Sequence, residues 1–164
     1  MALTLGIDPG SRITGFGVLK SKRSSIEYAG SGVIKTDTKK TRPERLRIIK
    51  ISIDRVIEQY SPDSIAVEEI FIAKNPKSVL KLGEARGIVL LSAAEHGIPV
   101  HEYSPREVKM SVVGTGSAHK SQVAAMIVKL LKLEKEPGSD DETDALAVAF
   151  CHENRKISLE GRLP

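Results

Sequence analysis

Four acidic side chains stand where the sequence suits metal chemistry. Asp8 ends an apolar run and is followed by Pro9-Gly10, a pair that marks a turn. Glu68 ends a second, shorter apolar run, and Asp141 and Asp144 are three residues apart, which makes them neighbours on one helix face. A carboxylate at the end of a core strand is costly to desolvate unless a cation or hydrogen bonds hold it.

The plainer interpretations explain only part of this set. Most Asp-Pro-Gly stretches are solvated turns, and acids such as Asp141 are favoured in the first turn of a helix by its dipole. Neither accounts for Asp144 on an apolar stripe. Four converging carboxylates would repel one another, whereas Mg²⁺ or Mn²⁺ prefers such hard oxygen ligands. A pair of such ions activates water and stabilises the leaving oxygen, so the pattern predicts phosphodiester hydrolysis.

Hydrophobic periodicity predicts the elements that carry these acids. We expect three strands joined by short turns, then two further strands separated by a helix, with three more helices towards the end of the chain. The expected strands span 3–8, 12–20, 25–36, 64–68 and 98–103, and the helices span 43–60, 76–95, 105–112, a stretch around 123–131 and one that begins near 139.

This order predicts an α/β fold: a mixed five-stranded sheet with helices on both faces. The first strand should lie centrally, with strand 64–68 parallel beside it. Asp8 and Glu68 would then leave the sheet at the same edge, where open α/β sheets place their ligands.

Composition is that of a globular domain of 164 residues with a net charge of +4. We expect one domain over 1–153 and a flexible tail over 154–164. With one cysteine, no apolar stretch of membrane length and no secretory signal, we expect a cytoplasmic protein without a membrane partner. Basic residues gather within 35–50 and 74–86, which suits either a solvated face or a phosphate-binding one.

Five blocks of the sequence resemble the RuvC family of Holliday junction resolvases. They are GIDPGSRITGFGV, VEEIFIAKN, LGEARG, VVGTGSAHKSQV and DETDALAVA, in order along the chain to about residue 150. The resemblance implies an RNase H-like fold, a homodimer, and Mg²⁺-dependent nicking of two strands of like polarity in a four-way DNA junction during recombination and repair. It also implies a branch-migration motor, RuvA and RuvB, as partner. Mn²⁺ is the expected substitute for Mg²⁺.

Matched block to block, the resemblance assigns the catalytic and metal-binding roles to Asp8, Glu68, Asp141 and Asp144. Glu69 should face away from Glu68 by strand alternation and is not included.

The resemblance also implies DNA-binding residues. It marks Lys109 and Lys120 as functional, and Lys120 follows a glycine loop at the start of a helix whose free N–H groups suit a phosphate. GTGSAHKS, at 114–121, resembles a P-loop but has His119 where that motif requires glycine, which excludes a P-loop ATPase. We also expect Arg12 to contact DNA phosphates.

An aromatic side chain follows the Glu68 strand. Phe71 either caps the core or wedges against an unpaired base at the crossover, and its neighbour Lys74 suits a phosphate contact. The family carries an aromatic residue in this loop, which favours the wedge.

Other functions remain open on the residues alone. The opening strand-turn-strand also occurs in actin-like ATPases and sugar kinases, although these need two such domains. An architectural junction-binding protein or a nuclease for RNA–DNA hybrids are further alternatives. The helix 76–95, apolar nearly all round in its second half, is either buried between sheet and helices or a dimer interface.

Overall fold

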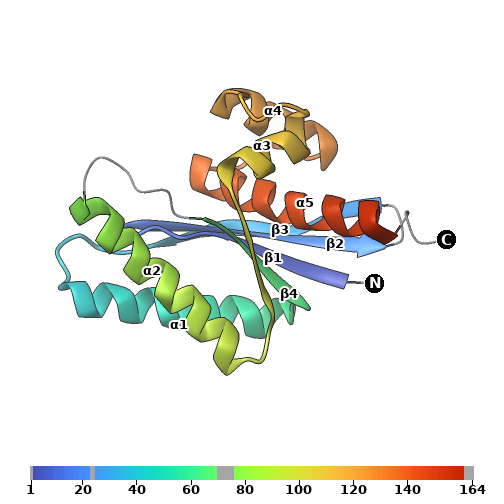
Figure 1. The fold of residues 1–164 in the computed structure, drawn as a ribbon. Coiled ribbons are helices and arrows are strands. Elements are labelled where there is room, and N and C mark those ends of the chain that lie inside the picture. The colour runs from blue at the N-terminus through green and yellow to red at the C-terminus, as the bar shows by residue number, and fades with distance from the viewer. Residues whose placement is uncertain (1, 23–24, 70–75, 161–164) are drawn as a thin grey trace.

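The computed structural model describes residues 2–22, 25–69 and 76–160, which form one five-stranded sheet with helices on both faces (Figure 1). The strand order is β3-β2-β1-β4-β5, so the predicted mixed sheet is confirmed. The elements are β1 (Ala2–Asp8), β2 (Ile13–Lys22), β3 (Ser25–Lys35), α1 (Arg42–Tyr60), β4 (Ser64–Glu68), α2 (Pro76–Glu95), β5 (Val100–Tyr103), α3 (Pro105–Val113), α4 (Lys120–Leu130) and α5 (Asp140–Glu160).

Strand register decides where the sheet presents its carboxylates. β1 is central, antiparallel to β2 and parallel to β4. Asp8 lies opposite Gly15, and Ile7 lies opposite Val67, one residue before Glu68. Asp8 and Glu68 therefore leave the sheet at the carboxyl ends of two adjacent parallel strands, as predicted.

Alternation along the strands builds two separate hydrophobic cores. Leu5 and Ile7 of β1 point to the face covered by α1 and α2. Leu19 of β2 and Ala66 of β4 point to the other face, where α5 packs on the sheet and α3 and α4 lie beyond it (Figure 1). No helix of the described part of the chain is long and apolar enough to cross a membrane.

Glycines on β1 and β2 let α5 approach the sheet closely. A Cβ added at Gly6 would meet the Ala145 carbonyl oxygen, and one at Gly15 would meet the Asp141 carbonyl oxygen. The first turns of α5 are therefore held against the strand that pairs with Asp8.

A loose tail was expected from residue 154, but α5 continues to Glu160. Tertiary contacts hold this extension in place. The Asn154 amide donates to Ser111 Oγ at 3.0 Å, and the Arg155 guanidinium pairs with Glu107 at 2.5 Å. The expected boundary after residue 153 therefore falls inside a helix, because the polar residues that suggested a tail make contacts with α3.

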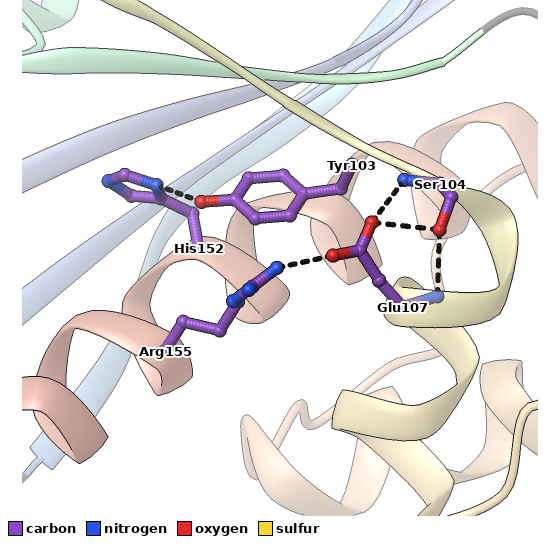
Figure 2. Close-up of polar contacts among 5 residues, drawn as sticks. All are labelled: Tyr103, Ser104, Glu107, His152 and Arg155. Carbon is purple, nitrogen blue, oxygen red and sulfur yellow. Dashed lines mark hydrogen bonds and ion pairs between the residues drawn. The ribbon is translucent and has the colours of Figure 1, made fainter.

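Polar contacts join β5 and α3 to α5 (Figure 2). The Tyr103 hydroxyl lies 2.7 Å from His152 Nδ1, and burial together with neighbouring His101 lowers the pKa of His152 to about 4. The Glu107 carboxylate accepts hydrogen bonds from the backbone N–H and the hydroxyl of Ser104, which caps α3.

Candidate active site

Four carboxylates from three elements gather at the carboxyl edge of the sheet. Asp8 and Glu68 end β1 and β4, whereas Asp141 and Asp144 come from the first two turns of α5. The pKa of Asp8 responds to the charge of each of the other three, so the structure brings together all four predicted acids.

Asp8 is the most strongly perturbed of these acids. Burial raises its pKa from 3.8 to about 7, assisted by the negative charges of Asp144, Glu68 and Asp141, whereas Lys120 acts in the opposite direction. Near pH 7 this carboxyl group is therefore poised between its protonated and ionised forms. Desolvation beside like charges is the condition under which a cation binds most favourably.

Glu68 and Asp144 show the same tendency. Burial is the largest cause that raises the pKa of each, and Asp144 adds to the rise at Glu68. Lys120 and Lys109 lower the pKa of Glu68 through their positive charges. The two lysines therefore partly neutralise the carboxylate edge.

Lys120, the first residue of α4, forms an ion pair across the site. Its Nζ lies 2.8 Å from Asp144 Oδ2 and 3.6 Å from Asp140 Oδ2. Burial lowers the pKa of Lys120, but the hydrogen bond to Asp144 and the nearby acids raise it above its usual value. The ammonium group therefore stays charged beside the carboxylates.

The donor set suits a hard divalent cation. Carboxylate oxygens are the ligands that Mg²⁺ and Mn²⁺ prefer, and their mutual repulsion is relieved when a cation binds. Within the described ranges, no three Asp, Glu, His or Cys side chains already form a single coordination shell. Asp144 instead turns to the Lys120 ammonium.

A cavity of about 190 Å³ opens beside this edge, between α3, α4 and α5. Glu68 and Asp144 line it together with Lys109 and Lys120. The structure thus places both predicted lysines next to the acids, with Val108 and Val123 as apolar walls. Carboxylates that could hold a metal, beside two cations, form an arrangement suited to a phosphodiester.

Other predicted residues lie elsewhere. Arg12 is exposed on the turn after β1 and lines a different cleft from that of Lys109 and Lys120. Glu69 is exposed, and its exclusion from the ligand set stays a prediction. Phe71 and Lys74 lie outside the described residues.

Asp140 is a site residue that the sequence analysis did not single out. It approaches Lys120 and raises the pKa of Asp144. Its sequence position is that of an ordinary acid in a first helical turn, and only the distance between α4 and α5 reveals the contact.

Comparison with known proteins finds one family along nearly the whole chain. Residues 4–152 match the family model described as crossover junction endodeoxyribonuclease RuvC. A RuvC of this description from Histophilus somni is 50% identical over 154 residues, which cover 94% of this chain and 80% of the relative. One from Vibrio vulnificus is 47% identical over 159 residues, covering 97% and 91% of the two chains.

Solved structures agree. A Thermus thermophilus RuvC in complex with Holliday junction substrate superimposes with a TM-score of 0.91 at 33% identity and covers 96% of both chains. The yeast mitochondrial Holliday junction resolvase Ydc2 shares the fold, with a TM-score of 0.67 at 15% identity over 96% of this chain and 82% of that one. The predicted RNase H-like fold is confirmed.

Proposed function

The chain belongs to the RuvC family of crossover junction endodeoxyribonucleases, and on this basis we propose that it resolves four-way DNA junctions by nicking two strands of like polarity. The observation that carries the proposal is the gathering of Asp8 with three further carboxylates at the edge where β1 and β4 end. Desolvated carboxylates that repel one another at such an edge destabilise the fold. A bound cation would offset this destabilisation, which explains why the carboxylates lie together.

Asp8, Glu68, Asp141 and Asp144 would hold Mg²⁺, or Mn²⁺ in its place. The metal would supply an activated water and stabilise the leaving oxygen of the phosphodiester. Asp8 would be the central ligand, since it responds to all three other acids. Asp141 would contribute from the first turn of α5.

Lys120 and Lys109 would bind and orient the phosphate that is cut. Their charges already act on Glu68, and both line the cavity beside it. Since Lys120 pairs with Asp144 at 2.8 Å, its ammonium is within reach of any phosphate that approaches this carboxylate. Phe71 as a crossover wedge and Lys74 as a phosphate contact stay predictions.

A homodimer would supply one active site for each cleaved strand of a two-fold junction. The outer face of α2 supports this proposal, because it is apolar. Leu80 and Leu91 are 65% and 49% exposed. Gly83, Gly87 and exposed Ala94 lie on the same face, three or four residues apart, and opposite buried Val89. Association with RuvA and RuvB and a cytoplasmic location stay predictions from the sequence.

Replacing single acids tests the proposed activity. We expect Asp8→Asn, Glu68→Gln and Asp144→Asn each to abolish nicking of a synthetic four-way junction in Mg²⁺, while junction binding persists because each change removes negative charge. Glu69→Gln is the matched control, since this exposed acid lies next to Glu68 and should nick normally. Gel electrophoresis of labelled strands measures nicking, and fluorescence anisotropy measures binding.

Two outcomes would contradict the proposal. If binding falls in parallel with nicking in the three variants, the acids have a structural role. If wild-type protein hydrolyses ATP, or cuts RNA–DNA hybrids in preference to junctions, another of the functions considered above is correct.

A further inference from the structure

A second cleft, of about 460 Å³, opens on the face of the sheet that α1 and α2 cover. Four segments that are distant in sequence line it: the β1–β2 turn, the loop before α1, α1 itself and the first turns of α2. We call it the basic cleft, and its lining residues are Ser11, Arg12, Thr38, Arg45, Ser78, Lys81 and Leu82.

The charge of the basic cleft is positive. Arg12, Arg45 and Lys81 contribute cations and, among its described lining residues, none is acidic. Acids nearby on α1 and α2 already have partners. Glu44 accepts hydrogen bonds from the backbone N–H and hydroxyl of Thr41, and Glu84 pairs with Arg42. Three cations and three hydroxyl groups around one cleft are the donors that bind a phosphate.

One of these cations is held in place by the fold. The Arg45 guanidinium donates from Nε to Thr36 Oγ1 at 3.1 Å and from Nη2 to the Ser11 carbonyl. The Thr36 hydroxyl in turn donates to the same carbonyl at 2.9 Å. Arg45 therefore ties the turn that carries Arg12 to α1, and little side-chain entropy remains to be lost when an anion binds.

The basic cleft and the pair Lys109 and Lys120 lie on opposite sides of the carboxylate edge. Its first lining residue, Ser11, is three residues after Asp8, and its helices are those of the α1–α2 layer. Lys109 and Lys120 lie in the layer of α3, α4 and α5. Cationic sites thus flank the four acids on both faces of the sheet.

We propose that the basic cleft binds a backbone phosphate of a DNA arm that leaves the active site on the α1–α2 face, while Lys109 and Lys120 contact the strand on the opposite face. This inference rests on the proposed junction-cleaving function. DNA that reaches both cationic sites must bend around the carboxylate edge, which a branched junction does at less cost than a straight duplex.

Lys81 is the residue to replace, because it is exposed on the first turns of α2 and Arg45 also supports the turn. We expect Lys81→Ala, in an Asp8→Asn background that prevents cutting, to weaken four-way junction binding about tenfold and to reduce the slope of log affinity against log salt by about 1. Lys81→Glu should weaken binding further. Lys22→Ala is the matched control, since Lys22 is an exposed cation at the opposite end of β2.

Fluorescence anisotropy with a four-way junction and a linear duplex of the same sequence makes the measurement. The proposal predicts a larger loss for the junction than for the duplex. Equal losses, or a Lys81→Ala protein that behaves as Lys22→Ala does, would overturn it. A second experiment titrates inorganic phosphate into the same proteins. If phosphate binding depends on Lys81 while junction binding does not, the basic cleft serves a free anion.

Nicking by wild-type protein separates the two hypotheses. If wild type nicks junctions and Lys81→Ala binds them as Lys22→Ala does, only the basic-cleft inference fails. If wild type does not nick junctions, the proposed function fails first.

Discussion

At the scale of single residues, Asp8 carries the largest consequence of the fold for the candidate site. A carboxyl with a pKa of about 7 binds protons in the folded chain that it would have released in the unfolded chain, where its pKa is near 3.8. The cause is burial beside three further acids, which lowers the stability of the metal-free protein near neutral pH.

This linkage predicts a pH dependence of stability. Since the pKa of Asp8 is raised in the folded state, its favourable contribution is complete below about pH 4 and is lost as the pH rises to about 7. The raised pKa values of Glu68 and Asp144 act in the same direction. In metal-free buffer, we expect the melting temperature of wild type to fall relative to that of Asp8→Asn over this range, by several degrees.

Differential scanning calorimetry of both proteins measures the effect. Mg²⁺ added at the upper end of the range should raise the melting temperature of wild type and leave Asp8→Asn nearly unchanged. Parallel melting curves for the two proteins at every pH would show that Asp8 is ionised normally.

At the scale of elements, the docking of α5 on the sheet decides where Asp141 and Asp144 lie. Gly15 faces the Asp141 carbonyl and leaves no room for a side chain. The same close contact continues along the helix, where Gly17 lies below Leu146. The acids of α5 therefore reach Asp8 because β2 has no side chain at the point of approach.

Gly15→Ala tests this dependence. The new Cβ would meet backbone atoms of Asp141 and Glu142, so the first turn of α5 must shift away from Asp8. We expect nicking to fall about a hundredfold, since small displacements of reacting groups have effects of this size, together with a loss of about 1–3 kcal/mol in stability.

Gly138→Ala is the control, because its Cβ would meet only Glu142 Oε2 at 3.5 Å, an ordinary contact. A Gly15→Ala protein with wild-type nicking and melting temperature would show that the approach of α5 is not needed.

At the scale of the whole molecule, the sheet buries one face of α2 and leaves the opposite face apolar and exposed. Ala85, Val89 and Ala93 enter the core, whereas Leu80 and Leu91 remain open. A helix on the surface of a single chain normally shows polar residues there. The proposed homodimer would bury this face of α2 against a second copy of the chain, which would also provide the second active site.

Gly87→Leu separates folding from dimerisation. Nothing lies within 4 Å of a Cβ at Gly87, and leucine favours helix over glycine, so the single chain should be no less stable. A side chain between two α2 helices should block their approach. We expect sedimentation velocity to find a monomer that nicks the two strands of a junction independently.

Ala125→Leu, an exposed position on α4, is the control and should remain dimeric. A Gly87→Leu protein with the sedimentation coefficient of wild type would place the interface elsewhere.

The amino-acid sequence by itself determined the elements, the mixed sheet and the edge at which Asp8 and Glu68 meet. These follow from local signals: period-two strands, helical apolar stripes and turn residues such as Pro9-Gly10. The motifs also identified the family and the two acids of α5. Such features are predictable because local patterns define the elements and general rules of strand pairing assemble them.

Only the tertiary structure decided the remaining features, because they depend on distances between segments far apart in sequence. The pKa of Asp8, the pairing of Lys120 with Asp144, and the separation of Arg12 from Lys109 and Lys120 all belong to this class. The extension of α5 beyond residue 153 does too, since the polar residues that suggested a tail are held by Ser111 and Glu107 of α3. Burial and charge at these places arise from packing, which no local pattern records.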